Sequence, residues 1–204
     1  MISFEEIKAF LPQYLTEDHQ QRLISVLKSF PEKFRDGAYT EEQTVVEQLL
    51  QGDGVPDFPI VNLPSVVVKN GKALIISNSC DIATENKREI RPKRLSFCPI
   101  VDLTLYESAL SEVGVSAQQI GSHVVEIKAQ KISNIFYLPK AEKMSGDGIV
   151  FFDSLLSIDN AALDRNEIIS KKLFTLSDAG WYFLLLKMSI HFTRMNEGVK
   201  RGIP

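Results

Sequence analysis

The chain has 204 residues, of which 44% are hydrophobic and 24% are charged, so it can bury one substantial core but is short for several large domains. Its formal net charge of −3 excludes an overall basic character that would attract nucleic acid or an anionic membrane. Its apolar runs fall short of the roughly 20 residues of a membrane span, and no cationic region precedes an apolar stretch at the N-terminus, so we expect a cytoplasmic protein with no membrane partner.

Residues 1–51 are predicted to form helices interrupted by prolines. Ser3 and Glu6 have the spacing of a capping box, and so do Thr40 and Gln43. Apolar residues recur at helical intervals after each pair. We therefore expect an N-terminal helical extension.

From Gly52 onward, short β-rich runs alternate with turn residues, which indicates a boundary between residues 1–51 and residues 52–204. The runs at 66–68 and 73–76 flank Asn70-Gly71, a dipeptide that tolerates the positive φ angles of a tight turn. This pattern predicts a β-hairpin that turns at Asn70-Gly71. Three further short strands are predicted, at 95–101, 135–138 and 149–152. Several short strands indicate a small barrel.

Residues 103–130 are predicted to be helical, because Ser116 and Gln119 form a capping box ahead of an apolar face. An alternative interpretation makes 124–128 a strand. A C-terminal helix is predicted to begin after Ser177. Its apolar stripe, expected to dock on the sheet, comprises Trp181, Leu184, Leu185, Met188 and Phe192.

The two cysteines, Cys80 and Cys98, lie in separate apolar segments and form no Cys-x-x-Cys pair. Such cysteines are typical of reduced thiols in a reducing compartment. No cluster of metal-ligating residues surrounds them, so we expect neither a bound metal nor a cofactor.

A polar cluster follows the apolar run at 73–76 directly, and it consists of Ser77, Asn78, Ser79, Cys80 and Asp81. In one interpretation Cys80 is a nucleophile or redox centre, with Asp81 orienting a histidine such as His123 or His191. In the other, which turn propensities favour, the polar side chains satisfy backbone groups in a turn and the cysteine is a small buried hydrophobe. The cluster is therefore the first candidate site to test.

The segment 85–94 packs five cations and two carboxylates into ten positions. Its basic residues are Lys87, Arg88, Arg91, Lys93 and Arg94. Such a segment could contact the phosphates of RNA or DNA. Because aromatic residues for base stacking are missing from it, a solvated charged loop is the commoner explanation.

Several short motifs occur in a suggestive order: Gly52-Asp53, Asn62-Leu63-Pro64, the strand-like run at 73–78 and the run Phe97-Cys98-Pro99-Ile100. This order resembles the MazF/PemK toxin family, with its leading G-D, its R-P-x-L-V-I-S-N strand and its V-A-P-I-T strand. The segment 148–159 is similar to a later strand of that family, and 176–178 then opens a terminal helix. The resemblance spans about residues 52–195. It implies an α+β fold: a small SH3-like antiparallel β-barrel with an N-terminal helical extension, an inserted helical segment and a C-terminal helix.

In that family, an arginine ahead of the L-V-I strand and a threonine or serine closing the A-P-I-T strand carry RNA cleavage. The corresponding positions here are Gly71-Lys72 and Val101-Asp102. Lysine lacks the bidentate fork of arginine, and valine supplies no hydroxyl. The resemblance therefore implies a binding or regulatory protein without the family's usual ribonuclease site, in a bacterial toxin–antitoxin, prophage or phage-defence setting. A protein partner or a homodimer is expected, because barrels of this type commonly pair.

The alternative hypothesis is a metal-independent endoribonuclease with a rebuilt active site. Lys72 and the basic segment would bind phosphate, and a polar group would activate the 2′-hydroxyl of the RNA. The candidates for that polar group are Ser77, Ser79, Asp81 and Asp102, with Cys80 as the candidate nucleophile of the same region.

Overall fold

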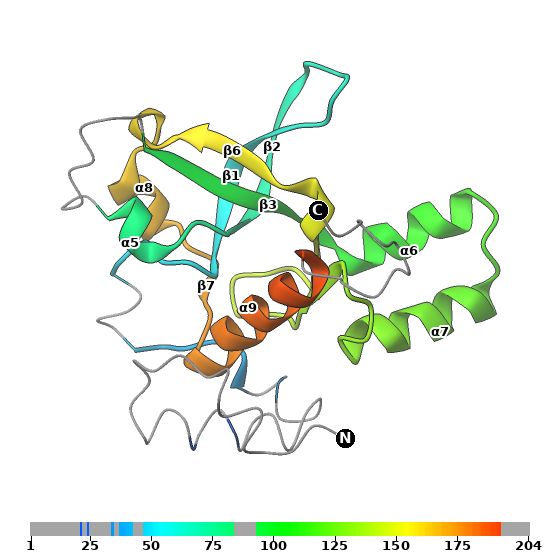
Figure 1. The fold of residues 1–204 in the computed structure, drawn as a ribbon. Coiled ribbons are helices and arrows are strands. Elements are labelled where there is room, and N and C mark those ends of the chain that lie inside the picture. The colour runs from blue at the N-terminus through cyan, green and yellow to red at the C-terminus, as the bar shows by residue number, and fades with distance from the viewer. Residues whose placement is uncertain are drawn as a thin grey trace, which may run out of the picture.

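A computed structural model describes residues 37–42, 47–83 and 93–192, together with Gln21, Ile24 and Phe34. These residues form a strongly curled antiparallel sheet, about half of a barrel, with helices around it (Figure 1). The predicted α+β class is therefore confirmed. Most of the predicted N-terminal helices lie outside the described residues. Within the described part, residues 47–50 are not helical, although the helix predicted to follow the Thr40 and Gln43 capping box was expected to include them.

The sheet contains the strands β1 (Asp53–Val61), β2 (Val68–Ile75), β3 (Arg94–Asp102), β4 (Ile135–Leu138), β5 (Gly148–Phe151), β6 (Leu156–Asp159) and β7 (Phe174–Thr175). Their spatial order is β4-β5-β3-β2-β1-β7, and every pairing is antiparallel. β5 and β6 pair with successive parts of β3, at 100–102 and 94–97. The strands predicted at 95–101, 135–138 and 149–152 are confirmed to within a residue or two.

The α-helices whose bounds lie within the described residues are α5 (Ser79–Ile82), α6 (Leu103–Glu112), α7 (Ala117–Lys128), α8 (Arg165–Ser170) and α9 (Asp178–Phe192). α6 and α7 form a helical hairpin that projects to one side of the sheet (Figure 1). The predicted capping box at the start of α7 is present, with the Ser116 side chain accepting from the backbone N–H of Gln119. The alternative strand at 124–128 is wrong, because this segment is the last part of α7.

Alternating side chains divide the core between the two faces of the sheet. Leu74 of β2 and Cys98 of β3 pack in a cluster with α9, whereas their neighbours Ala73 and Phe97 pack in a second cluster on the opposite face. Phe34 belongs to the α9 cluster as well. Part of the segment before residue 52 thus contributes to the same core as the sheet, and the predicted domain boundary stays a prediction.

The predicted turn at Asn70-Gly71 is wrong. Both residues lie inside β2, where Gly71 is opposite Phe58 of β1, and the chain reverses between Val61 and Val68. A Cβ atom on Gly71 would lie 2.5 Å from Cδ1 of Ile60. The glycine therefore makes room for the Ile60 side chain on the paired strand. Packing, and not a turn, explains the glycine in Asn70-Gly71.

The apolar stripe predicted on α9 is partly wrong. Leu184 is fully buried, but Phe192 is 58% exposed. Lys187 is buried on this helix instead, and its Nζ donates to Oε1 of Gln130 at 3.0 Å and to two backbone carbonyl oxygens, those of Ile132 and Ile135. These acceptors explain how an ammonium group can be accommodated in the core.

Candidate functional site

Lys72 and Asp102 meet at the end of the sheet. Lys72 of β2 donates from Nζ to Oδ1 of Asp102, the last residue of β3, because β2 and β3 are adjacent strands. The Lys72 Nζ also lies 3.4 Å from Oγ of Ser145, in the loop before β5. The two positions that the resemblance associates with catalysis are therefore brought together. A hydroxyl that sequence analysis missed lies beside them.

A second ion pair adjoins this one. Lys128 Nζ lies 2.9 Å from Oδ2 of Asp147, whose Oδ1 accepts from the backbone N–H of Lys140 at 3.0 Å. Burial favours a higher pKa for the Asp147 carboxyl, but the hydrogen bond and charge of Lys128 hold that pKa below its usual range. The backbone carbonyl of Asp147 accepts from the N–H of Leu103, next to Asp102. The two carboxylates and two ammonium groups here are paired one to one.

This pairing limits the chemistry at the sheet end. To bind phosphate, Lys72 would have to leave Asp102. A phosphate-binding role therefore requires the ion pair to open.

The polar cluster after β2 is mostly occupied by backbone contacts. Ser77 Oγ accepts from the N–H of Ser96 at 2.7 Å, and Ser79 Oγ accepts from the N–H of Gln51 at 2.9 Å. The Asn78 side chain caps α5. These three side chains satisfy backbone groups, as the turn interpretation predicts.

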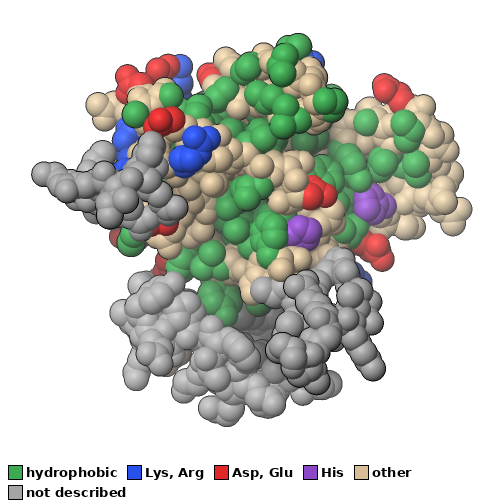
Figure 2. Space-filling model, turned by 45° about the horizontal axis from the view of Figure 1, so that its top comes forward, with side chains coloured by type: hydrophobic (Ala, Val, Ile, Leu, Met, Phe, Trp, Pro, Cys, Tyr) green, Lys and Arg blue, Asp and Glu red, His purple; other side chains and the backbone are tan. Residues whose placement is uncertain are grey.

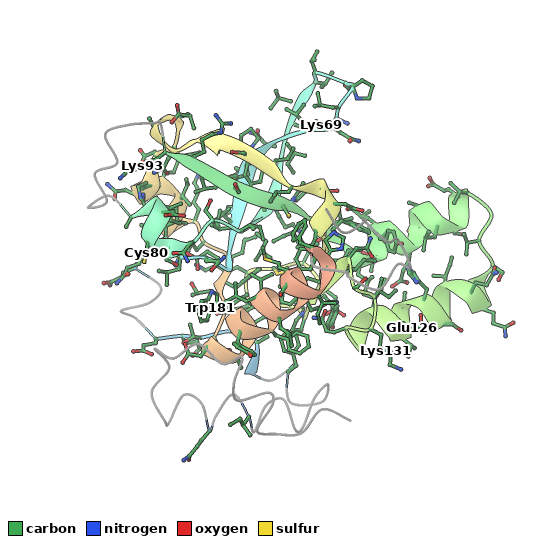
Figure 3. The ribbon with its side chains drawn as sticks, in the orientation of Figure 1. Lys69, Cys80, Lys93, Glu126, Lys131 and Trp181 are labelled. Atoms are coloured by element: carbon green, nitrogen blue, oxygen red, sulfur yellow. The ribbon has the colours of Figure 1, made fainter. Side chains whose placement is uncertain are left out.

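Cys80 and Asp81 belong to α5, and Cys80 is exposed, so the expectation of a buried thiol at this position is wrong (Figure 3). His123 lies in the α6–α7 hairpin, where its Nε2 is 3.1 Å from the Tyr106 hydroxyl, and that hairpin and α5 are on opposite sides of the molecule (Figure 1). The His191 ring packs against aromatic rings at the end of α9. Each histidine thus has a role elsewhere in the fold.

The basic segment is described only at its end. Lys93 donates from Nζ to the carbonyl of Ala83 at 3.0 Å, near α5 (Figure 3). Arg94 donates to both Oγ and the carbonyl of Ser157, which joins β3 to β6. These two cations therefore contact the chain itself. The other three candidates, Lys87, Arg88 and Arg91, lie outside the described residues.

Asp53, from the Gly-Asp motif that contributed to the resemblance, is buried. Its Oδ2 lies 3.1 Å from Nζ of Lys172, which also donates to the Gln48 carbonyl at 2.6 Å and to Thr175 Oγ1 at 3.0 Å. Burial raises the pKa of the Asp53 carboxyl and lowers that of the Lys172 ammonium, despite their mutual attraction. This buried pair ties β1 to the segment before β7.

A feature that sequence analysis did not identify is the end of the β1–β2 hairpin, residues 62–68, here called the hairpin tip. It projects from the body of the protein (Figure 1), and hydrophobic side chains gather over this part of the surface (Figure 2). Four large apolar side chains are more than half exposed there: Leu63 at 75%, Val66 at 82%, Val67 at 60% and Val68 at 57%. The sequence signal for this feature was the run of three valines at 66–68. That run was interpreted as a strand, so the exposure of its side chains was not predicted.

Beside the hairpin lies a groove of about 320 Å³, here called the α8 groove. Its apolar lining comes from Pro56, Phe58, Pro59, Ile158, Leu163 and Ile168. Its charged lining comes from Asp57, Asp164, Glu167 and Lys171. The hairpin and α8 therefore enclose an apolar floor with a mainly acidic rim.

Comparison with protein-family models finds no family that matches the chain, and comparison with curated proteins also finds no match. Within the described ranges, no group of three or more His, Cys, Asp or Glu residues is placed to hold a metal ion. In the same ranges, no helix has the length and apolarity needed to cross a membrane.

Proposed function

We propose that this protein is a binding module that contacts a protein partner through the hairpin tip, on a divergent barrel of the MazF/PemK type without that family's usual ribonuclease site. The observation that carries the proposal is the exposure of Leu63, Val66, Val67 and Val68 on one projecting hairpin. Exposed apolar patches of this kind mark interaction sites, and an uncovered valine-rich strand end otherwise favours aggregation.

The sheet end and the polar cluster after β2 both support a role in binding over one in catalysis. Lys72 is held by Asp102, and the hydroxyls of Ser77 and Ser79 accept hydrogen bonds from backbone amides. A ribonuclease needs a cation available to the phosphate and a polar group available for proton transfer. Such groups are already engaged here.

The shape of the hairpin tip favours a different protein as partner over a second copy. The tip is a narrow projection, and four side chains expose much less than the roughly 800 Å² that each partner contributes to a standard interface. Two convex tips would cover each other incompletely. A partner with a concave apolar surface would bury all four side chains.

Site-specific crosslinking in the native host tests this proposal. A photo-crosslinking amino acid at position 67 of the full chain should give one discrete adduct with another protein. The same amino acid at position 112, exposed at the end of α6, should give none. The captured protein, purified, should bind the chain about tenfold more weakly when Val66 and Val68 are both changed to Ser. Adducts containing only this chain, or equal adducts from both positions, would contradict the proposal.

A second function, metal-independent RNA cleavage, is favoured by the convergence of Lys72, Asp102 and Ser145. With the ion pair open, the Asp102 carboxylate would take the proton of an RNA 2′-hydroxyl as the 2′-oxygen bonds to phosphorus. The bond from phosphorus to the 5′-oxygen would break, and that oxygen would take up a proton from water. Lys72 would stabilise the charge on phosphate.

Incubation with mixed single-stranded RNA in the presence of EDTA tests this second function. Cleavage that is abolished by Lys72→Ala and Asp102→Asn but retained by Lys128→Ala would support it. Lys128 is the matched control, because it forms the neighbouring ion pair. Intact RNA after incubation with the unmodified chain would exclude this function for these substrates.

A further inference from the structure

The α8 groove carries a chemical signature that narrows the choice of partner. We propose that the groove takes an arginine or lysine side chain of the protein segment that the hairpin tip binds, with the aliphatic stem on the apolar floor and the cationic group beside Asp57. This inference rests on the proposed binding function.

The floor of the groove suits an aliphatic stem. Phe58 is buried beneath it, and Ile158, Leu163 and Ile168 pack against the same core cluster from β6 and the α8 region. Long cationic side chains commonly lay their methylene groups along apolar surface and keep the charged head at the rim. A short or anionic side chain would use either the floor or the rim, but not both.

The charges of the groove select a cation. Three carboxylates and one ammonium line it, which leaves a net charge of −2. The ammonium is already paired, because Lys171 Nζ lies 2.6 Å from Oε1 of Glu167. Asp164 accepts from the backbone N–H of Glu167 and so caps α8. Asp57 is exposed and lines the same groove. Its carboxylate attracts the Lys171 ammonium and is open to an incoming cation from solvent.

The groove and the hairpin tip belong to one surface. Pro59 of β1 and Asn70 of β2 line the groove, and the same two strands continue to the tip. Pro56 and Pro59 have no N–H group, so a partner cannot add a regular strand along this edge of β1. A partner is therefore recognised beside the hairpin through side-chain contacts, such as a cationic side chain bound in the groove.

The backbone at Asp57 permits a clean test. This residue has a φ of 57° at the irregularity between Val55 and Phe58 in β1. Asparagine tolerates this left-handed conformation as well as aspartate does. Asp57→Asn should therefore remove the charge and leave the path of the chain unchanged. Lys171→Gln is the reciprocal change, because it removes the like charge that opposes an incoming cation.

The experiment uses fluorescein-labelled ten-residue peptides and the full chain. In the first peptide leucine alternates with arginine, and in the second glutamate replaces each arginine. We expect fluorescence anisotropy to report binding of the first peptide only. Asp57→Asn should weaken this binding about fivefold, and Lys171→Gln should strengthen it about twofold. Glu112→Gln, a remote acidic position on α6, should leave it unchanged.

The outcomes separate this inference from the proposed function. Equal binding of both peptides, or equal affinity for Asp57→Asn and the unmodified chain, would overturn the assignment of the groove. Amide chemical-shift changes that leave out the residues lining the groove would overturn it as well. If crosslinking from position 67 persists in any of these cases, the hairpin tip remains a binding element and only the groove fails.

Discussion

The sheet end, which contains Lys72 of β2, and the hairpin tip, which leads into β2 at Val68, differ in which groups remain available. At the sheet end, Lys72 is paired with Asp102, and the neighbouring Lys128 is paired with Asp147. At the tip, Val66 and Val67 are more than half exposed. The charged residues that resemble catalytic groups are engaged within the chain, whereas the residues that resemble ordinary strand core are available to a partner.

This contrast shows that residue type is a poor guide to what a site can do. A charged side chain acts on a ligand only if its neighbours leave it accessible, and an apolar side chain contributes to the core only if the chain folds over it. The following predictions, in order of decreasing effect, test whether the internal polar contacts are structural and the tip is not.

The largest effect is expected at the buried pair of Lys172 and Asp53. Lys172→Met would leave the Asp53 carboxylate buried without its cation, and we expect the free energy of unfolding to fall by about 3–5 kcal/mol. Urea denaturation measures this change. The matched control is Lys171→Met, which alters an exposed pair and should cost much less. Equal losses for the two variants would contradict a structural role for the buried pair.

A smaller, pH-dependent effect is expected at Lys187. Burial lowers the pKa of its ammonium from 10.5 to about 7, so the unfolded state binds more protons between these two values. The contribution of Lys187 to stability should therefore rise as pH increases through that interval. Lys187→Met should cost about 1–3 kcal/mol at pH 9, because buried oxygens lose the N–H donors of the neutral amine, and less at pH 6.

Unfolding by urea at several pH values measures both parts of this prediction. The unmodified chain should gain stability relative to Lys187→Met between pH 7 and pH 10. A constant difference over this range would show that Lys187 carries the same charge in the folded and unfolded states.

A still smaller effect is expected at the sheet end. Lys72 and Asp102 are about a quarter exposed, with side-chain exposures of 27% and 24%. Solvent therefore screens their ion pair, and Lys72→Ala should lower the free energy of unfolding by less than about 1 kcal/mol. Denaturation at low and high salt measures the change, and the loss should shrink in high salt. A loss of unfolding free energy several times larger would show that the ion pair contributes to stability as a buried pair does.

The smallest effect on stability is expected at the hairpin tip. Val66→Ser combined with Val67→Ser should change the free energy of unfolding by no more than about 0.5 kcal/mol, because both side chains already face solvent. Val55→Ser, on the buried part of β1, should cost several times more. Thermal or urea unfolding measures both variants. A strongly destabilised tip variant would mean that the valines contribute to folding, and the contrast with the sheet end would disappear.

The amino-acid sequence by itself determined the elements whose signals are local. β3, β4 and β5, the capping box of α7 and the start of α9 follow from β-rich runs and from cap residues within a few positions of the elements that they mark. The mixture of helices and strands followed from the same signals. Asn70-Gly71 shows where such signals fail, because Gly71 is required by Ile60 across the strand pair and not by a turn.

Only the tertiary structure decided which side chains meet and which remain exposed. Lys72 is 30 residues from Asp102 and 73 from Ser145 along the chain, so their convergence depends on how the strands pair. The burial of Lys187 among carbonyl oxygens and the exposure of the valines at the tip depend equally on distant segments. Local patterns specify helices and strands because backbone preferences act over a few residues. The accessibility and charge environment of a side chain are set by contacts across the whole fold.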